Sequence, residues 1–156
     1  MNDVVKRGVA VVKGGVLVAA GLTLLLASAA VLKAQDAAIK INDGVFTEAQ
    51  ADRGKAAYAK NCQSCHGEAM TGIDTAPPLV GGTFLGNWTG QSLGDLAVRV
   101  RTTMPLNKPG TLGSATVADI ISQILKANGY VAGAADLPRD VQVLQMIRID
   151  APKPAT

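Results

Sequence analysis

The chain has 156 residues, enough for one domain and a short additional segment, and it contains 17 glycines but only five aromatic residues. Bulky side chains that fill a core are therefore scarce. The formal net charge of +3 lies entirely in residues 1–33, because acidic and basic side chains balance over residues 34–156. A neutral body lacks the basic surface that nucleic-acid binding requires, so no nucleic-acid partner is expected.

The N-terminal segment has the organisation of an export signal. Lys6, Arg7 and Lys13 precede an uncharged apolar run over residues 14–32. This run has 19 residues, which is also just long enough to cross a bilayer as a helix. We therefore predict an N-terminal hydrophobic helix, with residues 1–33 acting as a signal peptide or as a membrane anchor. Both place the rest of the chain in the periplasm or on the outer face of the membrane, because the positive flank stays inside.

The next two segments are predicted to be a linker and a helix. Residues 34–46 mix charge, alanine and a turn-forming Asn-Asp-Gly without a sustained apolar period, which favours a linker. Thr47 and Gln50 then fit a capping box, and the pattern that follows predicts a helix as far as the cysteines.

The C-terminal half is also predicted to be helical, after a loop over residues 67–90 that is rich in Gly, Pro and Thr. Ser92 and Asp95 open a short helix that Pro105 ends. Thr116 and Asp119 repeat that start for a helix ending near Gly129, whereas residues 141–149 fit a helix or an extended segment. The sequence thus predicts an all-α domain of three to four helices over residues 47–149, with residues 150–156 as a C-terminal tail.

Both cysteines and the only histidine of the chain lie within five residues, Cys62-Gln63-Ser64-Cys65-His66. This is the attachment sequence of c-type haem, in which two thiols bond covalently to the haem vinyl groups and the adjoining imidazole binds iron. A thioredoxin-type pair is disfavoured because no strand is predicted before Cys62. A zinc site would need a fourth ligand, and a disulfide between Cys62 and Cys65 would be strained. Covalent haem c, with His66 as an iron ligand, is the prediction.

A six-coordinate iron needs a second axial ligand, and a methionine thioether is the available choice once His66 is used. Met1 lies in the export segment, and Met70 is only four residues from His66. Met104 precedes Pro105 and a turn-rich loop that can press a side chain against the iron. We predict Met104 as the ligand, with Met146 or a five-coordinate iron as the alternatives.

Several segments together resemble the class I cytochromes c of the bacterial, single-haem kind. The residues "GKAAYAKNCQSCHG" are similar to the first helix and haem site of that family, "APPLVG" to its proline loop, "TMP" to its distal-ligand loop and "VADIISQILKANGYVAG" to its closing helix. The resemblance implies a cytochrome c fold around one covalent haem. It also implies that the first and last helices cross near Gly54 and Tyr58.

The same resemblance implies further haem contacts. The Pro77 carbonyl would accept a hydrogen bond from His66, and Trp88 would donate to a haem propionate, with Arg99 and Arg101 as further propionate partners. One position departs from the family pattern, because Gln123 stands where closing helices often carry a tyrosine.

An iron held by His66 and Met104 has no vacant position, so the expected function is single-electron transfer without catalysis of bond chemistry. The expected partners are redox proteins, namely a dehydrogenase as donor and an oxidase or another cytochrome as acceptor. The membrane is a further partner if residues 14–32 are retained. Two alternatives stay open: a haem subunit of a periplasmic oxidoreductase complex, whose tail beyond Gly133 docks a catalytic partner, and a ligand-binding haem sensor.

Overall fold

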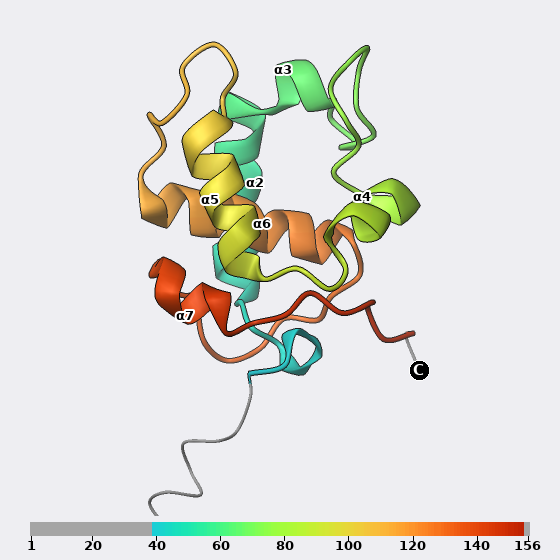
Figure 1. Cartoon of the computed structure of the whole chain (residues 1–156), viewed down its shortest axis with the longest axis vertical. Helices are drawn as coiled ribbons and strands as arrows, with labels where there is room; N and C mark the ends of the chain where they lie inside the picture. The colour runs from blue at the N-terminus through green and yellow to red at the C-terminus, as the bar shows by residue number, and fades with distance from the viewer. Residues whose placement is uncertain (1–38, 155–156) are drawn as a thin grey trace, which may run out of the picture. The chain divides into compact units, whose positions relative to one another are not determined.

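The computed structural model describes residues 39–154, and the predicted hydrophobic helix, signal peptide or anchor and first part of the linker lie outside them. The described elements are η1 (Ile41–Asp43), α2 (Glu48–Asn61), α3 (Gln63–His66), α4 (Gly81–Trp88), α5 (Leu93–Thr103), α6 (Ser114–Ala127) and α7 (Val141–Gln145). Within this range there is no strand, only an isolated bridge between Ser92 and Arg148. The all-α prediction is confirmed (Figure 1). None of the helices described is long and apolar enough to cross a membrane.

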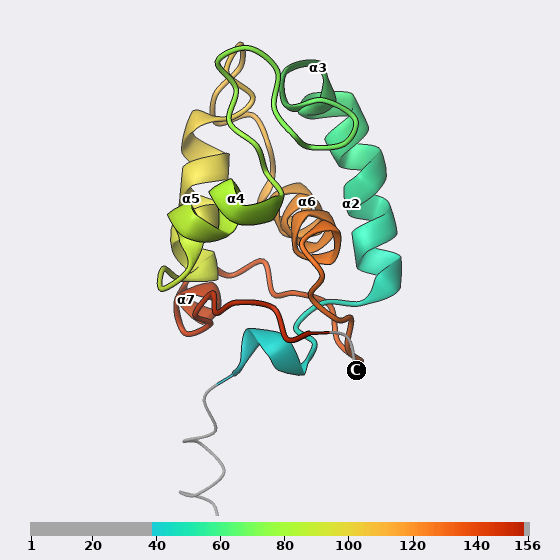
Figure 2. The same cartoon turned by 90° about the vertical axis from the view of Figure 1, so that its right-hand side faces the viewer.

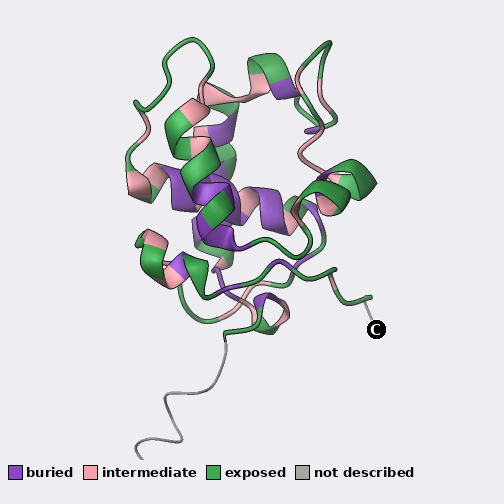
Figure 3. Ribbon diagram, viewed as in Figure 1, coloured by how far each residue is buried: buried purple, intermediate pink, exposed green. Residues whose placement is uncertain are grey.

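The crossing of α2 and α6 is the most extensive contact between helices in the described part of the chain, and α6 runs across α2 in Figures 1 and 2. The two backbones meet at Gly54, where a Cβ atom would lie 1.8 Å from the carbonyl oxygen of Asp119 and 3.0 Å from Cβ of Gln123. Only glycine permits this approach. Gln123, the departure from the family pattern, thus lies at the crossing itself. Facing surfaces of α2, α5 and α6 are buried (Figure 3).

Ion pairs on the surface reinforce the same crossing. Arg53 of α2 pairs with Asp119 of α6 at 3.3 Å and with Asp136 at 2.7 Å, and these contacts raise the pKa of the guanidinium. Lys126 of α6 pairs with Glu48 of α2 at 2.5 Å. Because all of these groups are at least partly in solvent, the ion pairs are screened and contribute little, and apolar burial holds the helices together.

The predicted helix starts are correct for two helices and wrong for a third. Thr47 caps α2 by accepting from the backbone N–H of Gln50 at 3.0 Å, and α5 begins with a complete capping box between Ser92 and Asp95. The Gln50 side chain does not close the expected box at α2, because it is buried and bonded to Leu137.

The structure corrects the predicted start of the closing helix. α6 begins at Ser114 instead of after Thr116, with Gly113 as its N-cap. The Asp119 carboxylate is drawn to Arg53 and is not part of a cap. The expected end is confirmed, because Gly129 follows the C-cap residue Asn128 and has φ +86°, a conformation that glycine adopts without strain.

Two stretches predicted to be non-helical, a loop and a linker, contribute side chains to the core. Residues 67–90, predicted as a loop, contain the helix α4. Phe84 of this helix is buried, and Trp88 packs against the core, with the centroids of the two rings 6.5 Å apart. In the segment predicted as a linker, Ile41, Val45 and Phe46 are buried. The packed domain therefore extends back beyond residue 47.

Residues 141–149 combine both of the structures that their sequence allows. Val141–Gln145 form α7, and the chain then continues as an extended segment whose Ile149 N–H donates to the Gln91 carbonyl at 2.8 Å. Leu144, Ile147 and Ile149 are fully buried. Residues 141–149 thus pack on their own domain, and these three apolar side chains are not available for docking a partner.

Candidate haem-binding site

The two cysteines lie where α2 gives way to α3. Cys62 is the C-cap of α2, with its N–H bonded to the Tyr58 carbonyl at 2.8 Å, and Cys65 lies in the single turn of α3. The backbone N–H of His66 donates to the Cys62 carbonyl at 3.0 Å. Both thiols are free, with Cys62 half-buried against the core and Cys65 exposed. One helical turn therefore presents two unpaired thiols next to an imidazole.

The orientation of His66 is fixed by one hydrogen bond. Its imidazole is buried, and Nδ1 lies 2.9 Å from the carbonyl oxygen of Pro77. A carbonyl oxygen only accepts, so Nδ1 carries the proton and donates it. The lone pair of the neutral ring is then on Nε2. An imidazole held in this tautomer, beside two free thiols, fits the donor set of haem c.

The loop that follows His66 is tied down by several hydrogen bonds. The Gly72 N–H donates to the His66 carbonyl at 2.9 Å, and the Leu79 N–H donates to the Met70 carbonyl at 2.8 Å. At the start of the loop, the hydroxyl of Tyr58 donates to the Gly67 carbonyl at 2.6 Å. The segment that carries the Pro77 carbonyl is therefore an ordered part of the site.

Burial shifts the acid–base behaviour of two groups near α3. Desolvation raises the pKa of the Cys62 thiol to about 11, with a smaller contribution from the neighbouring Cys65. Desolvation likewise raises the pKa of the Tyr58 phenol to about 12. Both groups are protonated near neutral pH in the polypeptide, so Cys62 is a thiol and not a thiolate before it is attached to any group.

The methionines differ in their surroundings. Met104 is the C-cap residue of α5 and is half-buried at the start of the loop over residues 104–113. Both views of the fold place that loop and α3 at the same end of the domain (Figures 1 and 2). Met70 is buried in the core, whereas Met146 is 60% exposed beside α7.

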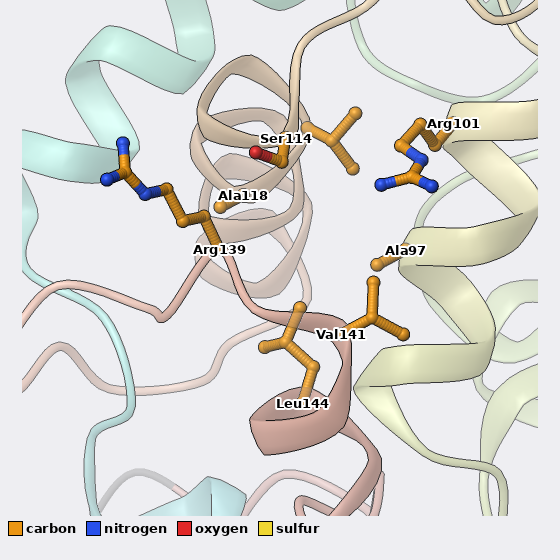
Figure 4. A pocket seen from close by; sticks show the side chains of 8 residues that line it. Ala97, Arg101, Ser114, Ala118, Arg139, Val141 and Leu144 are labelled. Carbon is orange, nitrogen blue, oxygen red and sulfur yellow. The ribbon is translucent and has the colours of Figure 1, made fainter.

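The residues expected at the haem propionates come from two helices, α4 and α5. Trp88 is half-buried at the end of α4, and Arg99 is exposed on α5. Arg101 is exposed and lines a small cavity between α5, α6 and α7, together with Arg139 and Ser114 (Figure 4). No lining residue of that cavity belongs to α3, to α4 or to the proline loop.

One residue that holds the proline loop, residues 76–81, is not identified by sequence reasoning. Asn128 reaches from the end of α6 to Leu79 and Gly81. In sequence, an Asn-Gly pair after a helix indicates only a helix end. Nothing in the pattern shows where its amide points.

Metal binding by side chains alone has no support in the part of the chain that the structure describes. Within residues 39–154, no group of three or more His, Cys, Asp or Glu side chains is close enough to hold an ion.

Part of the chain matches a model of a known protein family. Residues 49–122 match the family model described as "Cytochrome C oxidase, cbb3-type, subunit III". The matched range contains the two cysteines, His66, Pro77 and Met104.

Comparisons with individual proteins provide weaker support than the family model. A search of curated proteins finds no match. Among solved structures, a chain in the crystal structure of the sulfane dehydrogenase SoxCD from Paracoccus pantotrophus is similar, with 27% identity and a TM-score of 0.43 over 63% of this chain. The alignment spans 54% of that chain, about half its length. A TM-score this low establishes neither a shared fold nor shared partners.

Proposed function

We propose, for a chain that contains a class I c-type cytochrome domain, that it carries single electrons on one haem c bonded to Cys62 and Cys65. One observation supports this most strongly. His66, directly after Cys65, is buried with Nδ1 bonded to the Pro77 carbonyl, so that Nε2 is the nitrogen available to iron. Bound haem c supplies an iron that alternates between the ferric and ferrous states by one electron.

The second axial ligand proposed is Met104. It is half-buried at the end of α5, and the loop that it begins lies at the same end of the domain as α3. Met70 is buried in the core only four residues from His66, and Met146 is mostly in solvent. With His66 and Met104 both engaged, no position is left for a substrate, which favours electron transfer over ligand binding.

The polypeptide around the site has three tasks in this proposal. Pro77 fixes the tautomer of His66 and increases the basicity of its other nitrogen. The bond from Tyr58 to Gly67 holds the turn after His66 in place. Trp88 is proposed as a propionate donor, and Arg99 and Arg101 remain weaker candidates because both are exposed and Arg101 lines a different cavity.

The proposed setting is the periplasm or the outer face of the membrane, where c-type cytochrome domains typically occur. Residues 1–33 are proposed as signal peptide or anchor, because their charge and apolar run follow the order of export signals. Redox proteins are the partners, with a dehydrogenase as the proposed donor and an oxidase or another cytochrome as the acceptor. The alternative is a haem subunit of a periplasmic oxidoreductase complex, whose partner would have to use surfaces other than the buried side chains of residues 141–149.

Acid–acetone extraction of the exported protein tests covalent attachment. We expect the haem to stay with the polypeptide, and a proteolytic peptide containing Cys62 and Cys65 to carry the mass of one haem. Replacement of both cysteines by alanine should abolish the modification. Haem that passes into the acetone phase from the unaltered protein would contradict the proposal.

A further inference from the structure

Asn128, the C-cap residue of α6, uses its whole side-chain amide in hydrogen bonds. Its Nδ2 donates to the Ile124 carbonyl in its own helix at 2.8 Å and to the Leu79 carbonyl at 2.9 Å. Its Oδ1 accepts from the backbone N–H of Gly81 at 2.9 Å. The residue is 8% exposed, so these bonds are shielded from water. Only the first of them is an ordinary helix-end contact, because the other two join α6 to a segment nearly fifty residues earlier.

The segment that receives these bonds depends on them. Val80 is the N-cap of α4 and its side chain cannot accept a hydrogen bond, so the amide of Asn128 caps the N–H of Gly81 in its place. On the other side, the Leu79 N–H is bonded to the Met70 carbonyl. Leu79 and Gly81 are therefore held between the loop after His66 and the end of α6.

The position of Leu79 restricts the position of the Pro77 carbonyl. Leu79 follows Pro77 and Pro78, and each proline ring fixes its own φ near −65°. Few free torsions therefore separate the Leu79 carbonyl, bonded to Asn128, from the Pro77 carbonyl, bonded to His66. A displacement at Leu79 would move the acceptor that orients the imidazole.

We infer that Asn128 is a positioning residue, whose amide holds the proline loop so that the Pro77 carbonyl keeps His66 in the orientation needed for iron ligation. This inference rests on the proposed role of His66 as an axial ligand. Asn128 does not touch the imidazole and acts only through Leu79 and Gly81. Its removal should therefore loosen the bond between His66 and Pro77 without removing either partner.

The chain has a single histidine, so a holoprotein labelled with ¹⁵N-histidine reports on His66 alone. The quantity to measure is the hydrogen-exchange rate of its Nδ1–H in the reduced protein, because that proton is protected by the bond to Pro77. In Asn128→Ala we expect exchange at least tenfold faster than in the wild type. Asn128→Asp keeps an acceptor for Gly81 but loses the donor to Leu79, so it should also accelerate exchange, and it decides the question if the alanine variant does not fold.

Gln50→Ala is the matched control. Gln50 is a buried amide with two hydrogen bonds to the Leu137 backbone, and it lies twelve residues before Cys62, roughly 18 Å along a helix axis. Its replacement should lower stability and leave the exchange of the His66 proton within twofold of the wild type. The comparison separates positioning of His66 from a general loss of stability.

The outcomes distinguish this inference from the proposed function. His66 ring resonances without a paramagnetic shift in the ferric wild type would show that His66 is not a ligand, and would overturn the proposed function together with the inference. Shifted resonances with exchange unchanged in Asn128→Ala or Asn128→Asp would overturn the inference alone. Equal acceleration in Gln50→Ala would overturn it too, because the effect would then be one of stability.

Discussion

His66 shows how much of the proposed chemistry depends on one side-chain orientation. The ring is buried, its Nδ1 donates to the Pro77 carbonyl at 2.9 Å, and it follows two free thiols in the same helical turn. A histidine satisfied on both nitrogens would be an ordinary buried residue. Here one nitrogen is used and the tautomer is set, which is how proteins prepare an imidazole for a metal.

Replacement of Met104 by alanine tests the proposed second ligand. The protein should stay covalently haem-bearing through Cys62 and Cys65 but lose the far-red absorption band of methionine–iron ligation in the ferric state. Its reduction potential should fall, because the soft sulfur that favours ferrous iron is gone. Visible absorption and a potentiometric titration of the variant measure both effects.

Met146→Ala is the control for that variant. Met146 is 60% exposed, so its removal should change the free energy of unfolding by about 0.5 kcal/mol or less and leave the spectrum intact. Should the far-red band disappear in this variant and persist in Met104→Ala, the assignment of the ligand would be wrong.

Tyr58 gives a prediction about pH. Burial raises the pKa of its phenol to about 12, so the folded protein favours the neutral form, whereas the unfolded chain ionises near pH 10. The stabilisation is therefore complete below pH 10 and is lost as the pH rises toward 12. Tyr58→Phe should lose about 1 kcal/mol at pH 7 with the bond to Gly67, yet its stability should fall less steeply above pH 10. Denaturant unfolding across that range measures both slopes, and parallel slopes would count against the account.

At the scale of elements, the close crossing of α2 and α6 depends on the absence of a side chain at Gly54. Gly54→Ala would put a Cβ atom 1.8 Å from a backbone carbonyl of α6, so the helices must move apart. We expect a loss of about 2–3 kcal/mol or more in the free energy of unfolding.

Gly86→Ala is the control, because Gly86 lies inside α4 with nothing within 4 Å of the added atom. It should be neutral or stabilising by up to about 1 kcal/mol, from helix propensity alone. Equal effects of the two substitutions in thermal unfolding would refute the close crossing.

The elements predicted from sequence are those whose ends are set by neighbouring residues. The cap at Thr47 and the box at Ser92 are local patterns, and both occur in the structure. The start at Thr116 failed because Asp119 has a partner on another helix, Arg53, and a local pattern contains no information about that competition. The sequence does not predict α4 for a similar reason. Its glycine-rich residues favour a loop, and the packing of Phe84 and Trp88 on the core, which stabilises the helix, is not visible in a local pattern.

At the scale of the whole domain, the attachment motif can be predicted from sequence because its three side chains lie within five residues. The residues that orient His66 are not contiguous with it. Pro77 was expected only from the family resemblance, and Asn128 reaches the same loop from the far end of α6. The pairing of Ile147 with Leu93 and of Ile149 with Gln91 is likewise long-range, and the apolar pattern of residues 141–149 does not reveal it.

The most direct test of a closed, one-electron haem site is the absorption spectrum of the reduced holoprotein before and after carbon monoxide is added. With His66 and Met104 both bound to iron, the spectrum should not change. A shift of the visible bands on addition of carbon monoxide to the wild type would show an open coordination position. That result would contradict electron transfer as the proposed function and favour a ligand-binding haem protein.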